Sequence, residues 1–228
     1  MDDKKDILEK VDKLVCMYKK GLLGGEIMPE DENPNLDRNS LENYNYFTLP
    51  MALNYQRNSY KLWEGANKTW KDEETRFVFN TRKVENSDFE KVKEALVKYR
   101  VALQPNKQVE IWVKLCKTFN ELFNGDIRKI FEINNNNVEK IRKYIQQDNK
   151  AKFPYLSGNK ICNYWLYVLY QYTDIRFNNI EKLTVAPDTH VVKASYKLGL
   201  INEEELNSNN VQLIVIDRWN EILKDTRI

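Results

Sequence analysis

Three short segments of this chain carry side chains whose types and spacing could do chemistry. Residues 153–160 (FPYLSGNK) lead into the apolar run ICNYWLYVLY. A tight glycine turn before a helix exposes backbone N–H groups that can bind a phosphate. Lys160 is expected in the first turn of this helix, where the helix dipole and a desolvated setting both disfavour the ammonium form and favour a nucleophilic amine. The alternative is a solvated lysine beside an ordinary turn.

Two further segments add a carboxylate and a cluster of amides. In residues 185–191 (VAPDTHV), Asp188 is a good N-cap, and a carboxylate at a helix start stays ionised and could stabilise a developing cation. His190 could be a general acid, although we favour a structural role in the first helical turn. Residues 53–59 (LNYQRNS) place amide and hydroxyl groups on the helix that carries Trp63, where a solvent-facing polar stripe is the alternative.

Helices are expected to position all three segments. Apolar residues recur at helical spacing, and the 228 residues include only 7 Gly and 6 Pro, too few for an all-β chain with frequent turns. We predict an all-α fold in which residues 26–46 form an irregular surface segment. The expected helices lie at 7–22 (stopped by Gly24-Gly25), about 48–70, from 87, after 105, from 126, from about 138, about 160–172, 188–199, from 202 and 211–222.

Charge limits the class of function. The chain has 36 Lys and Arg against 34 Asp and Glu, a net charge of +2, which excludes a polyelectrolyte binder but not an enzyme with a local basic face. Such a face would suit DNA phosphates, although a solvated charged surface is the alternative. Between Asn137 and Lys160, two acidic residues stand against six basic ones: Lys140, Arg142, Lys143, Lys150, Lys152 and Lys160.

The remaining composition excludes several kinds of site. Three cysteines (Cys16, Cys116 and Cys162) and one histidine are too few for a disulfide framework or a conventional metal site, so we expect neither. Neither a GxGxxG nor a GxxxxGK[ST] motif occurs, which argues against a nucleotide-binding fold of those types. The charged N-terminus and the absence of an apolar run of about 20 residues favour a cytoplasmic protein without a membrane partner.

Together the three segments resemble the helix-hairpin-helix DNA glycosylases of base-excision repair, the superfamily of endonuclease III and the 8-oxoguanine glycosylases. LSGNKICNYWLYVL is similar to the family's hairpin and the helix that begins with its catalytic lysine. VAPDTHVVKASYKLGL is similar to its proline-rich loop, its aspartate and the helix that follows, and LPMALNYQRNSYKLWEGANK to an early helix whose glutamine enters the DNA. The resemblance covers about residues 48–228 in the family's order.

The resemblance implies a role for each matching residue. Lys160 would attack C1′ of the damaged nucleotide and form a Schiff base, while Asp188 would stabilise the oxocarbenium-like sugar and help to activate Lys160. Gln56 would fill the gap left when the base is flipped out of the duplex. Trp63 resembles the stacking tryptophan of the archaeal 8-oxoguanine glycosylases, and Trp219 would form a second pocket wall. A backbone phosphate would be held by the hairpin residues Leu156, Ser157, Gly158 and Asn159.

Three departures from the family pattern indicate which branch of the family the chain resembles. The hairpin has one glycine, Lys160 and Asp188 are 28 positions apart, and the four-cysteine loop of endonuclease III is absent. The resemblance then implies the cluster-free archaeal 8-oxoguanine type, with no iron–sulfur cluster or other cofactor. It also implies two helical domains with a DNA cleft between them. The expected divisions are 1–47, packing with the C-terminal helices, 48–172, ending in the helix-hairpin-helix, and 173–228.

The expected function is a bifunctional DNA glycosylase and apurinic or apyrimidinic site (AP) lyase. It would act as a nucleoid-associated monomer on double-stranded DNA that contains a damaged base, with 8-oxoguanine as the expected base. Two alternatives stay open: a helix-hairpin-helix DNA-binding protein without catalysis, and a glycosylase that acts on another modified base or nucleotide. Retention of both Lys160 and Asp188 speaks against the first alternative, because a binding protein needs neither.

Overall fold

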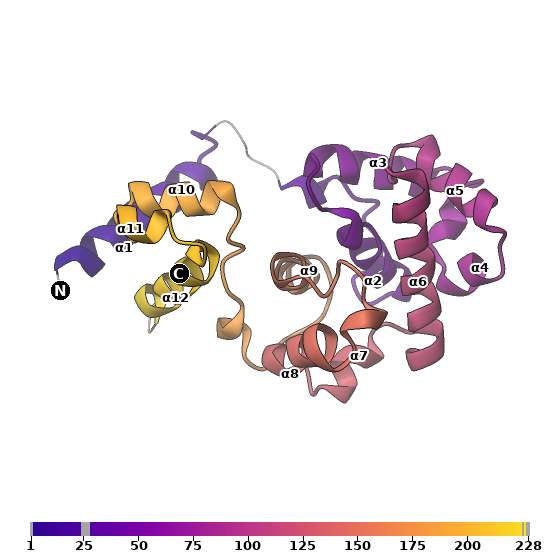
Figure 1. Cartoon of the computed structure of the whole chain (residues 1–228). Coiled ribbons are helices and arrows are strands. Elements are labelled where there is room, and N and C mark those ends of the chain that lie inside the picture. Colours follow the sequence, from indigo (N-terminus) through magenta and orange to yellow (C-terminus); the bar gives the residue numbers. More distant parts are fainter. Residues whose placement is uncertain (1, 24–27, 225, 227–228) are drawn as a thin grey trace. The chain divides into compact units, whose positions relative to one another are not determined.

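The computed structural model describes residues 2–23, 28–224 and 226, and the regular elements in these ranges are all helical (Figure 1). No strand occurs there, so the prediction of an all-α fold is confirmed. The chain divides into two compact units: a terminal unit of residues 1–28 and 184–228, and a central unit of residues 29–183. Residues 29–47, which we grouped with the N-terminus, fall in the central unit. A DNA cleft between two domains stays a prediction.

In the terminal unit, the predicted helix ends are present. Asp188 Oδ1 accepts hydrogen bonds from the backbone N–H groups of His190 and Val191, both at 2.9 Å, and so caps the helix that follows. Gly199, with φ +79°, comes just after that helix ends. Asn202 and Glu205 form the predicted capping box. The described helices are α1 (Asp2–Lys19), α10 (Thr189–Lys197), α11 (Glu203–Leu206) and α12 (Val211–Leu223). The predicted stop at Gly24-Gly25 lies outside the described residues.

The central unit contains eight α-helices, joined by short 3₁₀ segments and one π turn. The α-helices are α2 (Leu41–Thr48), α3 (Ser59–Lys71), α4 (Thr81–Glu85), α5 (Phe89–Lys98), α6 (Pro105–Phe123), α7 (Lys129–Ile133), α8 (Val138–Lys143) and α9 (Asn159–Tyr172). The short segments are η1 (Pro29–Asp31), η2 (Pro50–Leu53), η3 (Arg76–Phe79), the π turn η4 (Tyr144–Asp148), η5 (Lys150–Lys152) and η6 (Ile180–Lys182).

Aromatic side chains fill the core of the central unit. Trp63, Trp112 and Trp165 are fully buried. Two of them also find hydrogen-bond acceptors, since Trp112 Nε1 donates to Val78 O and Trp165 Nε1 donates to Thr48 Oγ1, both at 2.9 Å. The second bond joins α9 to α2, two helices that are far apart in sequence and pack together. The core therefore fixes α9, the helix that carries Lys160, against the early part of the unit.

Two predictions about residues 26–70 are wrong. Within the described part of the expected irregular segment, α2 is a regular helix that Ser40 Oγ caps by accepting the N–H of Asn43 (3.2 Å). The expected helix over about 48–70 is interrupted, because Pro50 has no N–H to continue α2 and the chain forms η2 instead. A new helix, α3, starts only where Asn58 Oδ1 accepts the N–H of Lys61 (3.1 Å). Polar residues that suggested a surface loop are caps and buried hydrogen-bonding groups.

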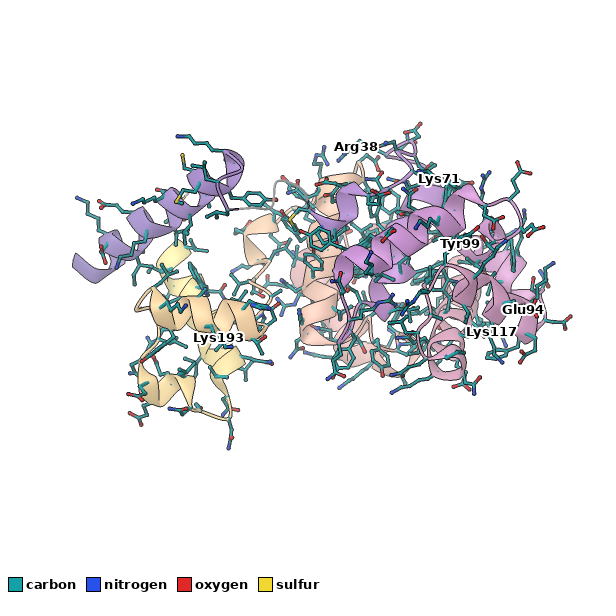
Figure 2. All side chains as sticks on the ribbon, turned by 90° about the horizontal axis from the view of Figure 1, so that it is seen from above. Arg38, Lys71, Glu94, Tyr99, Lys117 and Lys193 are labelled. Carbon is teal, nitrogen blue, oxygen red and sulfur yellow. The ribbon has the colours of Figure 1, made fainter. Side chains whose placement is uncertain are left out.

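The C-terminus of α9 is fixed by side chains from the first turn of α2 and from the segment before it. Arg38, labelled in Figure 2, donates from Nη2 to the carbonyl oxygens of Gln171 (2.7 Å) and Thr173 (2.6 Å). Asn43 Nδ2 donates to Tyr172 O (2.9 Å). The last carbonyl groups of a helix have no partner within the helix, and a cation near them is favourable. These bonds therefore stabilise the end of α9 opposite to Lys160.

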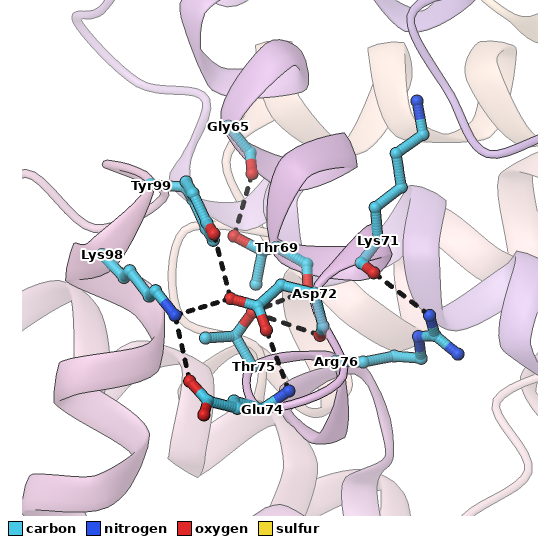
Figure 3. A network of polar contacts seen from close by, with 9 residues as sticks. All are labelled: Gly65, Thr69, Lys71, Asp72, Glu74, Thr75, Arg76, Lys98 and Tyr99. Carbon is cyan, nitrogen blue, oxygen red and sulfur yellow. Dashed lines mark hydrogen bonds and ion pairs between the residues drawn. The ribbon is translucent and has the colours of Figure 1, made fainter.

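A polar network joins α3 to α5 (Figure 3). Asp72, just after α3, lies at its centre and accepts from Lys98 Nζ (2.7 Å) and from the hydroxyl group of Tyr99 (3.0 Å) on Oδ2. Its Oδ1 accepts the backbone N–H of Glu74 (2.9 Å). The pKa of the Asp72 carboxyl is lowered to about 2, first by the bond from Lys98 and then by the N–H of Glu74. The network therefore favours the ionised carboxylate.

Candidate nucleic-acid interface

The predicted tight turn is present before α9. After α8 the chain passes through η4 and η5 and turns at residues 153–158. The backbone N–H groups of Leu156, Ser157 and Gly158 donate to carbonyl oxygens two to four residues earlier, at 2.7–3.0 Å. The side chains of Leu156 and Ser157 are buried. Contrary to expectation, these three amides serve the turn itself. The first-turn amides of α9, which have no carbonyl partner within the helix, are better placed to receive a phosphate.

Lys160 lies where the sequence predicts it. Gly158 is the N-cap of α9 and the helix begins at Asn159, so Lys160 is in the first turn. Asn159 Oδ1 accepts from Gln146 Nε2 (3.2 Å), which ties the helix start to η4. The Lys160 side chain is exposed rather than desolvated, which differs from the expected setting. The positive end of the α9 dipole is retained and would attract an anion such as a phosphate to this place.

Gln56 lies in a turn that hydrogen bonds from the neighbouring residue hold in place, and not on a helix. The chain between η2 and α3 gives Gln56 a left-handed conformation, with φ +49°, and leaves its side chain exposed. The neighbouring Arg57 donates from Nη1 to Val101 O (2.6 Å) and from Nη2 to Arg100 O (2.8 Å), joining this turn to the segment between α5 and α6. Rigid support on one side and an exposed amide on the other suit a residue that enters a duplex.

The structure brings the Gln56 turn together with the turn at residues 153–158, which we call the hairpin. The ring of Tyr55 lies edge-on to that of Tyr155, with 5.6 Å between centroids and 64° between planes. Tyr155 has φ +61° and belongs to the hairpin turn. Lys107, in the first turns of α6, lies with Nζ 5.5 Å from the centre of the Tyr155 ring. Two segments selected independently from the sequence, about 100 residues apart, therefore form one surface of the central unit.

A cavity of about 140 Å³ opens in this surface and has a cationic lining. Arg57 and Lys107 line it, and none of the lining residues carries a carboxylate. Arg57 Nε is buried without a protein acceptor, and burial together with the charge of Arg100 lowers the pKa of the guanidinium to about 10. Such a cavity suits a ligand rich in acceptors, such as a phosphate or the edge of a base. The remaining lining residues are Ala52, Leu53, Tyr55, Gln56, Leu103, Gln104, Gln108, Ile111 and Tyr155.

Trp63 lies in the core and not on a pocket surface. Its ring is packed between Tyr46 and Phe47, each with a centroid separation of 5.7 Å, and none of it is exposed. The indole Nε1 has no hydrogen-bond partner, although it is a donor that a buried tryptophan usually satisfies. A base could stack on Trp63 only if this packing opened.

A buried carboxyl lies beside this unpaired indole. Glu30 is fully buried, and its Oε2 accepts from the hydroxyl group of Tyr164 on α9 (2.9 Å). Its Oε1 has no partner, as is also true of Oδ1 of Asn67, one helical turn after Trp63 on α3. Burial raises the pKa of Glu30. The Trp63 indole is close enough to oppose that rise, but the two groups do not meet the geometry of a hydrogen bond.

Sequence reasoning missed this cluster of Glu30, Trp63, Asn67 and Tyr164, which we call the Glu30 cluster. The carboxyl occurs in the acidic stretch PEDEN, which has the composition of a solvated loop. Only its position next to Pro29 at the start of η1, which packs on α3, buries it. The one sequence signal was Trp63 itself, with Asn67 four residues later on the same helical face.

The two remaining predicted residues belong to the terminal unit. Asp188 caps α10, as described above, and Trp219 on α12 donates from Nε1 to Ser195 Oγ on α10 (2.9 Å). Trp219 is partly exposed. The pairing of Asp188 with Lys160, and of Trp219 with Trp63, would join the two units and stays a prediction.

Comparison with known proteins does not assign a family. No family model matches the chain, and no curated protein and no solved structure is significantly similar to it. The helix-hairpin-helix interpretation therefore depends on the quoted motifs and on the geometry of the central unit.

None of the helices in the described residues has the length and apolar character that crossing a membrane requires. Among the same residues, no group of three or more His, Cys, Asp or Glu side chains is arranged to hold a metal ion.

Proposed function

We propose that this protein is a DNA glycosylase with AP lyase activity, which flips a damaged base out of a duplex and excises it. One observation carries the proposal: the Gln56 turn and the hairpin that starts the Lys160 helix form a single surface, joined through Tyr55 and Tyr155. A wedge residue and a phosphate-binding helix start must lie side by side to act on one distorted DNA backbone. The cationic cavity between them supports contact with an acceptor-rich ligand.

In this proposal Lys160 and Asp188 carry the chemistry. The Lys160 amine attacks C1′, the base departs with the electron pair of the glycosidic bond and takes up a proton, and the sugar opens to a Schiff base. Loss of a C2′ proton and of the 3′ phosphate then breaks the strand, and water releases the lysine. The Asp188 carboxylate stabilises the positive charge that develops on the sugar.

The Glu30 cluster supports recognition of a base. Glu30 Oε1 and Asn67 Oδ1 are unpaired acceptors, and the rings of Trp63 and Tyr164 lie beside them. A flipped base is read through hydrogen bonds to its edge and stacking on its faces. Unpaired acceptors favour a base with several N–H donors, and 8-oxoguanine has one more than guanine. The base would enter only if the packing over Trp63 opened.

Borohydride trapping on duplexes with single lesions tests this function. The lesions are 8-oxoguanine, uracil, thymine glycol and an abasic site. We expect a covalent band with 8-oxoguanine that disappears in Lys160→Gln and is retained in Lys150→Gln, a control at an exposed lysine on η5. Trapping only at abasic sites would leave the lyase and refute 8-oxoguanine as the base.

The same experiment separates the two alternatives. If the chain is a DNA-binding protein without catalysis, the unmodified protein will bind the duplexes but will not be trapped on any lesion. That result would refute the Schiff-base mechanism. A glycosylase of another modified base or nucleotide would be trapped on a different lesion or would be inhibited by free nucleotides. If its substrates are free nucleotides, Gln56→Ala would leave its activity unchanged, because no duplex gap has to be filled.

A further inference from the structure

The central unit has a second cavity that the proposed DNA chemistry does not use. Its volume is about 440 Å³, and it is lined by the start of α2, the end of α3, η3 and the start of α4. None of the residues assigned above to the hairpin, the Gln56 turn or the Glu30 cluster lines it. A cavity of this size holds a small molecule of one or two rings. It is lined by Leu41, Glu42, Asn45, Trp70, Glu73, Arg76, Phe77, Phe79, Asn80 and Lys83.

Aromatic rings form the apolar part of this cavity. Trp70 and Phe79 meet edge-on, with 5.3 Å between centroids and 60° between planes. Phe77 is partly exposed beside them. Arg76 fixes the Trp70 ring, because its guanidinium carbon lies 5.8 Å from the ring centre and its Nε donates to Trp70 O (2.6 Å). The Trp70 ring is therefore held in place, and part of it is exposed.

One buried polar group in the cavity wall lacks a partner. Asn45 is 3% exposed, and its Nδ2 donates to Phe79 O (3.1 Å). Its Oδ1 is buried without a protein donor. Because Nδ2 is engaged, the amide can offer a ligand only an acceptor. A buried unpaired acceptor is unfavourable, so a ligand that brings an N–H group to Asn45 would gain both the hydrogen bond and the relief of that penalty.

The charges around the cavity favour a neutral ligand. Glu42 and Glu73 stand against Arg76 and Lys83, so the two signs balance. A phosphate would meet two carboxylates, and a simple cation would meet two basic groups. A neutral ring with an N–H donor avoids both conflicts and uses the aromatic surface together with Asn45.

We propose that this cavity binds a neutral, planar nitrogen heteroaromatic molecule of the nucleobase class, which stacks on Trp70 and donates an N–H to Asn45 Oδ1. The proposal stands on the cavity alone and does not depend on the proposed DNA activity. The aromatic side chain of a partner protein would need no N–H donor, so the two occupants differ in a property that can be measured.

Titration calorimetry of the whole chain with two matched probes tests the proposal. Benzimidazole carries an N–H donor and is neutral at pH 7.5, whereas 1-methylbenzimidazole has the same rings without the donor. We expect benzimidazole to bind at least 10-fold more tightly. Equal affinity would refute the role of Asn45 and indicate an apolar surface that accepts any ring, such as a partner's side chain. Absence of binding by both probes and by adenine would refute the site.

Two asparagine variants provide the matched comparison. Asn45→Leu removes the acceptor and should weaken benzimidazole binding at least 10-fold. Asn120→Leu is the control, because Asn120 also donates to a backbone carbonyl and has an unpaired Oδ1 but does not line this cavity. An unchanged affinity in Asn45→Leu would overturn the proposal. If Asn45→Leu does not fold, the two probes on the unmodified protein still decide between the outcomes.

Discussion

At the scale of single residues, Asp188 has a structural role that substitution can separate from its proposed chemical role. Its Oδ1 caps α10 by accepting two backbone N–H groups. Asparagine caps a helix about as well as aspartate, whereas alanine loses about 1 kcal/mol of stability. Asp188→Asn should therefore keep the unfolding midpoint and lower base excision about 100-fold or more, the scale of a lost electrostatic stabiliser. Asp188→Ala should lower both the unfolding midpoint and the rate of base excision.

Denaturation curves and single-turnover excision on the same two variants check this separation. Equal activity of Asp188→Asn and the unmodified protein would show that the carboxylate only caps the helix.

Lys107 is a second single residue whose proposed role can be tested by substitution. It lies over Tyr155 beside the cationic cavity, and we expect it to contact a DNA phosphate. Each phosphate contact releases a counterion, so Lys107→Gln should reduce the slope of log affinity against log salt by about 1. Lys117, on the same helix and outside the cavity lining, is labelled in Figure 2 and provides the control Lys117→Gln. Anisotropy titrations at several salt concentrations measure both slopes, and equal slopes would place the DNA elsewhere.

At the scale of elements, the close approach of α3 and the end of α5 depends on Gly65. A Cβ built at Gly65 would collide with the carbonyl oxygen of Tyr99. In an exposed helix, Gly to Ala stabilises by about 1 kcal/mol, but here the added methyl group must push two packed elements apart. We expect Gly65→Ala to destabilise the chain by about 1–3 kcal/mol. Urea unfolding measures the sign, and a stabilised variant would contradict this packing.

The Asp72 network gives stability a specific pH dependence. The folded pKa of Asp72 is lowered to about 2, chiefly by Lys98, and an unfolded aspartate titrates at about 4. Its contribution to stability is therefore fully present above about pH 4 and is lost as the pH falls towards 2. Asp72→Asn should flatten the acid limb of the stability curve, measured by urea unfolding from pH 5 to pH 2. Glu94→Gln, which removes an exposed carboxylate on α5 (Figure 2), is the control. An unchanged acid limb in Asp72→Asn would refute the role of the network.

Elements with strong local signals could be predicted from the sequence, and elements fixed by long-range contacts could not. Asp188, Gly199 and the Asn202–Glu205 capping box mark helix ends through bonds within a few residues, and the structure has them there. The prediction for the region around α2 was wrong because the polar residues there form hydrogen bonds with groups that are distant in the sequence. Asn43, for example, donates to Tyr172 O, 129 positions away. A local sequence pattern cannot indicate a hydrogen-bond partner that is so distant in the chain.

At the scale of the whole molecule, the sequence likewise predicts only the part of the candidate site that depends on local patterns. The hairpin turn and the placement of Lys160 followed from glycine and apolar patterning. The contact between the Gln56 turn and the hairpin, and the burial of Glu30, arise only from long-range packing, in which α3, α6 and α9 each pack against η2. Both features lie in the central unit. In the proposed function, DNA recognition therefore lies in the central unit, while Asp188 and Trp219 belong to the terminal unit.

The most direct test of the central claim is to locate the covalent bond that the proposed mechanism forms between this chain and DNA. The chain is trapped with borohydride on a duplex that carries 8-oxoguanine or an abasic site, digested with nuclease and protease, and mapped by mass spectrometry. We predict a single reduced sugar adduct on Lys160, in the peptide that begins α9. An adduct on another lysine or on the N-terminal amine, with Lys160 unmodified, would contradict the account.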